Sequence, residues 1–188
     1  MAQNGYKRLT TVIFASFFFL FANAQITFVK GYLINEKGDT LKGELKINPK
    51  KEHELYTKVF FKDESGVQKN YKPNKVKGYG FNNNHFISIS QDEEALFYKR
   101  LTNGTIILYK TSFETVNMNE TIHDHMWYLF KEGDKKITEV REGKFKKQLN
   151  EWMKDNQEIA NEFREEKEFN EASAIETIVK YNDWKKSN

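Results

Sequence analysis

Apolar and polar residues alternate along most of the chain between residue 25 and residue 141. In the clearest run, residues 40–47, Leu41, Leu45 and Ile47 fall on one side, and lysine, glutamate and threonine fall on the other. A period of two is typical of a half-buried β-strand. The same pattern predicts strands over residues 26–35, 40–47, 56–62, 67–71, 85–90, 96–101, 105–109, 126–131 and 136–141.

Short turn sequences separate these strands in pairs. Glycine-containing segments stand at 36–39, 63–66, 103–104 and 132–135, and Asn103-Gly104 is the strongest because both residues tolerate positive φ. Hairpins at this density indicate antiparallel pairing without long crossovers. Residues 96–109 carry apolar side chains on both faces, so we expect this hairpin at the centre of the sheet.

After residue 141 the apolar spacing changes to that of a helix. Phe145, Leu149 and the Trp152-Met153 pair fall on one stripe. Asp155 and Ser173 are each followed three residues later by glutamate, the spacing of a capping box, which predicts two further helix starts.

Together these patterns predict an α+β fold. An antiparallel β-sheet of about eight or nine strands, curled into a partial barrel or sandwich, occupies residues 25–141. A C-terminal helical tail, residues 142–188, packs against it. No glycine-, serine- or proline-rich linker interrupts residues 25–188, so we expect a single domain.

The first 24 residues have the three parts of an export signal. Lys7 and Arg8 precede the apolar run 12–21, and Ala22-Asn23-Ala24 supplies small residues for cleavage between Ala24 and Gln25. The apolar run is short for a membrane span, although an uncleaved anchor is the alternative. We therefore expect an exported protein, periplasmic or secreted, with no transmembrane segment after cleavage.

The basic and acidic residues are nearly balanced in number once the export signal is removed. Without Lys7 and Arg8, 28 of the 30 basic residues remain against 27 acidic ones, which argues against nucleic-acid binding. The tail is acidic and the strand-rich part is basic. Either the helices lie on a basic face of the sheet, or the tail binds a separate cationic partner.

His123 and His125 form the main cluster of metal-ligand residues. On a strand they share a face and could bind one metal ion, but a catalytic zinc needs a third protein ligand. His53 and His85 are isolated in the sequence. The chain has no cysteine, no Gly-x-Ser-x-Gly motif and no glycine-rich phosphate loop, so we expect no cofactor.

Aromatic residues are abundant, and two interpretations of them stay open. Interfaces and sugar-binding surfaces are rich in aromatic side chains, whereas strands also use such side chains to fill a small core. The candidates for an exposed aromatic surface are Tyr79, Phe81, Trp127, Tyr181 and Trp184.

Several short motifs resemble a set of uncharacterised exported proteins of Bacteroidota. They are Gly31-Tyr32, the hairpin Gly38-Asp39-Thr40-Leu41-Lys42-Gly43, the strand Phe97-Tyr98-Lys99-Arg100-Leu101 and the tail Tyr181-Asn182-Asp183-Trp184. The resemblance implies a shared fold and no particular activity. Asp39-Thr40-Leu41 also resembles an O-glycosylation acceptor triplet of such bacteria, and turn chemistry is the other explanation for it.

These observations favour a non-catalytic binding or cell-envelope interaction module. Its expected partner is an envelope or extracellular protein or a glycan. The alternative is a metal-dependent hydrolase that uses His123 and His125.

Overall fold

The structure, a computed structural model, describes residues 27–91, 94–117, 120–141, 143–163 and 169–188. The predicted signal peptide and its cleavage site between Ala24 and Gln25 lie outside these residues. The side chains of residues 117, 120 and 123 also lie outside the described part.

In the described part of the chain, ten strands form one open antiparallel sheet with β4 and β10 at its two ends. Their order is β10-β9-β8-β7-β6-β5-β1-β2-β3-β4, so most neighbours in the sheet are also neighbours in the sequence. Short turns join most of them, as expected for hairpins, whereas residues 48–58 between β2 and β3 contain helical segments. The strands are β1 (Thr27–Asn35), β2 (Thr40–Ile47), β3 (Val59–Asp63), β4 (Gln68–Tyr71), β5 (Val76–Phe81), β6 (Asn84–Gln91), β7 (Glu94–Arg100), β8 (Ile106–Asn117), β9 (Glu120–Lys131) and β10 (Thr138–Glu139).

Helical segments occur before β3, before β5 and in the C-terminal tail. None of the described helices is long and apolar enough to cross a membrane. The segments are η1 (Pro49–Lys51), α1 (Glu54–Thr57), η2 (Pro73–Lys75), α2 (Phe145–Trp152), α3 (Gln157–Asn161) and α4 (Glu171–Ser187).

The α+β class, the antiparallel sheet and the C-terminal helices are confirmed, and the sheet is open. The nine predicted ranges overlap nine of the ten strands, and the tenth strand is β5. Its sequence contains Gly78 and Gly80, which weaken the period-two signal. Gly80 is needed because Tyr32 of β1 lies across it: an added Cβ would stand 2.6 Å from the Tyr32 ring.

Two adjacent asparagines form the turn between β5 and β6. Phe81 pairs with Asn84, so only Asn82 and Asn83 lie between the strands, with φ values of 45° and 61°. Two consecutive positive φ values are typical of a type I′ turn, whose twist matches that of the flanking strands. Sequence analysis favoured Asn103-Gly104 for this kind of turn.

The Asn103-Gly104 segment belongs to a wider loop between β7 and β8. Gly104 has a φ of 134°, whereas Asn103 has no positive φ. The Leu101 N–H donates to the Leu108 carbonyl over 2.8 Å and closes the loop further from its tip. The expected two-residue turn is therefore wrong, because the loop is shaped around the side chain of Asn182 from α4, which lies against Gly104.

The central strands are covered on both faces, as predicted. Ile106, Leu108 and Leu129 are fully buried beneath the helical tail. On the opposite face, Tyr109 and Tyr128 belong to a separate apolar cluster. Alternation along each strand produces this division.

A further apolar core lies between α1 and the strands β1 to β3 and β5 to β7. Helix α1 occupies the first part of the predicted strand 56–62, so β3 begins at Val59. Tyr56 is fully buried, and its side chain enters the core from this helix instead of from a strand. The cluster consists of Leu33, Leu45, Tyr56, Val59, Phe61, Val76, Tyr79, Phe86 and Phe97.

Asparagine side chains begin the last two helices. The oxygens of Asn156 and Asn170 accept hydrogen bonds of 3.3 and 2.9 Å from the backbone N–H three residues on. The predicted caps Asp155 and Ser173 are therefore wrong, because asparagine satisfies the same orphan donors. Asp155 instead accepts a hydrogen bond of 2.8 Å from Lys185 of α4.

Candidate functional site: the β8–β9 arm

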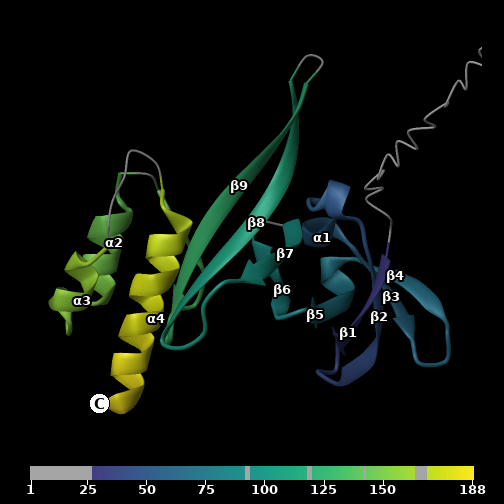
Figure 1. Cartoon of the computed structure of the whole chain (residues 1–188), viewed down its shortest axis with the longest axis horizontal. Helices are drawn as coiled ribbons and strands as arrows, with labels where there is room; N and C mark the ends of the chain where they lie inside the picture. Colours follow the sequence, from purple (N-terminus) through teal and green to yellow (C-terminus); the bar gives the residue numbers. More distant parts are fainter. Residues whose placement is uncertain (1–26, 92–93, 118–119, 142, 164–168) are drawn as a thin grey trace, which may run out of the picture.

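The distal halves of β8 and β9 extend beyond the rest of the sheet as a two-stranded ribbon (Figure 1). We call residues 111–117 and 120–126 the arm. The two strands stay in register from Ile106–Lys131 to Asn117–Glu120. Strand β7 pairs with β8 only as far as Lys110, and β10 pairs with β9 only at Tyr128 and Leu129. In the described part of the chain, no third strand therefore borders the arm.

The length of the arm follows from its local sequence. Residues 105–131 contain neither glycine nor proline and are rich in β-branched and aromatic residues. Each strand is consequently 12 residues long, about twice the usual length. The sequence prediction covered only residues 105–109 and 126–131, which form the part of the hairpin inside the sheet.

Three large apolar side chains of the arm face solvent. Phe113 is 36% exposed, Ile122 41% and Val116 73%. The register and the alternation of side chains place Val116 on one face and the other two on the opposite face. Between Lys110 and Lys131 the sequence has no lysine or arginine and three acidic residues. The arm therefore presents an acidic and partly apolar surface.

A carboxylate from α4 holds the base of the arm. The Lys110 ammonium lies 3.0 Å from the Glu171 Oε2, and the Trp127 Nε1–H donates to the same oxygen over 2.6 Å. The ammonium also lies 5.5 Å from the centre of the Trp127 ring. Because Lys110 is on β8 and Trp127 on β9, one side chain of the tail fixes both strands.

Helix α1 makes a second connection to the arm. The Nε2 of His53 lies 3.2 Å from the Oε1 of Glu114 on β8. Glu114 pairs with His123 of β9 across the ribbon. The arm is thus connected to the body through α1 as well as through α4.

His125 lies between these two connections and favours its neutral form. Burial is the main cause that lowers the pKa of its imidazole, and the positive charge of Lys110 adds to it. Three carboxylates, of Glu52, Glu171 and Asp124, act in the opposite direction. A neutral imidazole can accept a proton or bind a metal ion.

The structure brings the two predicted metal ligands to one face of β9 but adds no complete ligand set. His123 and His125 are two residues apart on the strand, and the side chain of His123 lies outside the described part. His53 contacts Glu114, and the Nδ1 of His85 lies 2.6 Å from the Tyr32 hydroxyl. Among the described residues, no group of three or more ligand-type side chains could bind a metal ion.

Two of the five candidates for an exposed aromatic surface belong to the core instead. Tyr79 and Tyr181 are fully buried, with their hydroxyls donating to the Leu55 carbonyl at 2.5 Å and to Asp155 at 2.8 Å. Such hydrogen bonds allow a tyrosine to fill a core. Phe81, Trp127 and Trp184 are half-buried and lie on different elements, so the five residues do not form a common surface.

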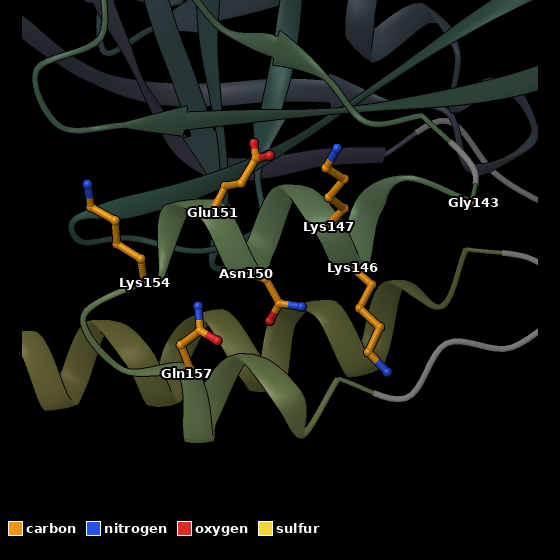
Figure 2. Close-up of a pocket in the computed structure, with 7 residues that line it drawn as sticks. All are labelled: Gly143, Lys146, Lys147, Asn150, Glu151, Lys154 and Gln157. Atoms are coloured by element: carbon orange, nitrogen blue, oxygen red, sulfur yellow. The ribbon is translucent and has the colours of Figure 1, made fainter.

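A shallow hollow over α2 and the start of α3 is the other candidate (Figure 2). Three of its lining residues are lysines and one is a glutamate, so it is cationic. Figure 2 shows the lysine side chains of α2 and of the turn after it pointing in different directions, and they do not converge on one point. The arm is therefore the stronger candidate. The hollow is lined by Gly143, Lys146, Lys147, Asn150, Glu151, Lys154 and Gln157.

Sequence analysis did not identify Lys110, Glu171, His53 or Glu114 as site residues. Each contact joins residues far apart in the chain, and charged residues of these types are common throughout it. The absence of lysine and arginine between residues 110 and 131 was the one available signal.

Comparison with family models, curated proteins and solved structures finds no match to this chain.

Proposed function

We propose that the protein is an exported, non-catalytic binding module of the cell envelope that engages another protein through the β8–β9 arm. The observation that carries this proposal is the exposure of Phe113, Val116 and Ile122 on a ribbon that extends beyond the sheet. An isolated two-stranded ribbon is marginally stable in water, and grouped exposed apolar side chains are typical of interaction sites. A partner that covers them would supply the missing burial.

The side chains of the arm favour a protein partner over a glycan. Sugar rings stack on exposed aromatic faces, and two of the five expected aromatic residues, Tyr79 and Tyr181, are buried in the core. Two of the three exposed apolar residues of the arm, Val116 and Ile122, are aliphatic. Aliphatic and acidic groups side by side suit the mixed surface of a protein.

Site-specific photo-cross-linking in the producing cell tests this proposal. Benzoylphenylalanine replaces Phe113 on the arm or, as the control, Val179, which is 41% exposed on α4. We expect a discrete protein adduct from position 113 and none from position 179. Adding Ile122→Asp to the position-113 variant should abolish the adduct, because Ile122 shares a face of the arm with Phe113 and the substitution places a charge in the covered surface.

The same adducts from both positions, or an adduct at position 113 that persists with Ile122→Asp, would contradict the proposal. Circular dichroism of each purified variant confirms that the sheet has formed.

Metal-dependent hydrolysis by His123 and His125 is the second candidate. The contact between His53 and Glu114 favours it, because Glu114 pairs with His123 in the register of β8 and β9. Calorimetric titration with zinc should give one ion per chain and no binding after His123→Ala with His125→Ala. His85→Ala is the control, since that imidazole contacts Tyr32. A wild-type chain that binds no zinc removes this candidate.

A further inference from the structure

We propose that the outer edge of β9, residues 120–126, binds an extended segment of the partner as an additional β-strand, and that this segment carries lysine or arginine side chains. The inference rests on the proposed function, because it names how the arm binds and what chemistry it selects. Strand addition of this kind obtains affinity from main-chain hydrogen bonds and specificity from alternate side chains.

Backbone geometry identifies the groups available at this edge. The Val140 N–H donates to the Trp127 carbonyl over 2.8 Å on the outer side of β9. In an antiparallel strand, the N–H and C=O of one residue point to the same side, and successive residues point to opposite sides. The backbone groups of residues 121, 123 and 125 therefore point away from β8, and no strand pairs with them in the described part of the chain.

Beside β8, the arm is approached by α1 and by His53, which contacts Glu114. The two terminal edges of the sheet are protected in the usual ways. Strand β4 is four residues long, contains Lys69 and is followed by Lys72-Pro73. Strand β10 is two residues long and lies between Lys135-Lys136 and Arg141. Short length, lysine and proline are the devices that keep edge strands from pairing with other chains.

The edge of β9 has none of these devices. Residues 120–126 contain no lysine, arginine or proline, and their register with β8 is unbroken by a bulge. The same chain thus protects its terminal strands and leaves this edge open. An open edge of seven residues is long enough to pair with a strand of ordinary length.

The negative charge of the arm indicates which kind of strand would pair with the edge of β9. Asp124 and Ile122 are exposed on one face of β9, and the whole stretch between Lys110 and Lys131 is acidic. A basic side chain opposite Asp124 would gain from the cross-strand pair. Like charges would instead repel if the acidic edges of two copies met, so we infer a separate cationic strand as the occupant.

Amide NMR of the full mature chain with two probe peptides tests the inference. The probes are Thr-Lys-Val-Lys-Val-Lys-Thr and Thr-Glu-Val-Glu-Val-Glu-Thr, each with blocked ends. We expect the lysine peptide to shift the amides of residues 121, 123 and 125 and to slow their hydrogen exchange. The glutamate peptide should bind with about tenfold lower affinity than the lysine peptide. Added salt should lower the affinity of the lysine peptide.

Two variants separate charge from backbone pairing. Asp124→Lys should reverse the preference between the peptides, whereas Glu139→Lys on β10 is the matched control and should leave it unchanged. Thr121→Pro removes one outward N–H without removing a hydrogen bond to β8. In this variant the lysine peptide should no longer slow the amide exchange of residues 123 and 125. The β8–β9 amides of each variant confirm that the arm is intact.

Shifts confined to β4 or β10, or no shifts with either peptide, would overturn the inference. Protection of residues 121, 123 and 125 that rises with protein concentration alone would also overturn it, because the occupant would then be a second copy. If neither peptide binds while the position-113 cross-link persists and depends on Ile122, the arm still binds a protein, but through its faces and not through the edge of β9. If the cross-link fails, the proposed function fails with it.

Discussion

Asn182 connects the helical tail to the loop between β7 and β8. Its Oδ1 accepts the Ile106 N–H at 2.8 Å, and its Nδ2 donates to the Ile106 carbonyl at 2.7 Å and the Asn103 carbonyl at 3.2 Å. The side chain is 7% exposed. It therefore satisfies backbone groups that water does not reach, and Gly104 leaves the space for it.

Replacing Asn182 with alanine should lower the free energy of unfolding by about 2 kcal/mol, because the buried Ile106 N–H loses its partner. Urea unfolding of the purified protein measures this change. Asp183→Ala, at an exposed position of the same helix, is the control and should change stability by less than about 0.5 kcal/mol. Equal effects of the two substitutions would show that the hydrogen bonds of Asn182 are unimportant.

His125 should make the protein less stable in mild acid. Its pKa is lowered in the folded state, first by burial and then by Lys110. The unfolded chain therefore binds the proton more tightly, near the ordinary value of about 6.5. The stabilising contribution of the neutral form is complete above that pH and is lost as the pH falls through the lowered pKa.

Two measurements check this prediction. The NMR titration midpoint of the His125 ring should lie below that of the unfolded chain, and His125→Gln should flatten the loss of stability between pH 7 and pH 5. A midpoint at or above the unfolded value would contradict the direction of the shift.

At the scale of elements, a two-residue turn sets the pairing of β5 with β6. This turn needs positive φ at both Asn82 and Asn83. Asparagine tolerates this conformation, and the resulting type I′ turn fixes the register of Phe81 with Asn84. In that register Gly80 pairs with His85 of β6, and on its other side Gly80 pairs with Tyr32 of β1.

Two substitutions at Asn83 should change stability in opposite directions. Asn83→Gly relieves the left-handed conformation and should be neutral or stabilising, whereas Asn83→Ala should cost about 1 kcal/mol. Thermal unfolding of both variants beside the wild type measures the difference. A more stable alanine variant would mean that the turn adopts another conformation.

At the scale of the whole molecule, polar contacts join the helical tail to the sheet and also join the parts of the tail to one another. Glu171 binds Lys110 and Trp127 at one end of α4. Near the other end, Asp155 accepts hydrogen bonds from Lys185 and Tyr181, and these lower its pKa to about 2. The contribution of Asp155 is therefore present above its ordinary pKa of about 3.8 and is lost as the pH falls through about 2.

Substitutions of Glu171 should loosen the base of the arm in two steps. Glu171→Gln keeps an acceptor for the Trp127 N–H and removes the ion pair with Lys110, whereas Glu171→Ala removes both. We expect faster amide exchange at residues 110 and 127 in the order wild type, Gln, Ala. Glu176→Gln on the same helix is the control, and equal exchange in all variants would mean that α4 does not hold the arm.

Local pattern predicted nine of the strands and the C-terminal helices, because alternation and helical spacing depend on neighbouring residues. It failed where distant groups decide the local structure. Strand β5 was missed because Gly78 and Gly80 make room for other strands. Asn103-Gly104 was assigned the wrong turn because Asn182, far along the chain, enters the loop.

The candidate site shows the same division. The sequence placed His123 and His125 on one face and supplied the acidic stretch of the arm, since both follow from spacing and composition. It could not place His53 beside Glu114 or Glu171 beside Lys110. It also left open whether Tyr79 and Tyr181 lie in the core or on the surface, and the structure buries both.

The sequence by itself determined that this chain forms antiparallel hairpins followed by helices, because the positions of turn residues and the period of apolar residues specify strands and helices locally. Only the tertiary structure decided which strand edges are paired and which remain open. Pairing depends on the path of distant segments. In the described part of the chain, β7 pairs with β8 only as far as Lys110 and β10 pairs with β9 only near Tyr128, so neither strand pairs with the arm.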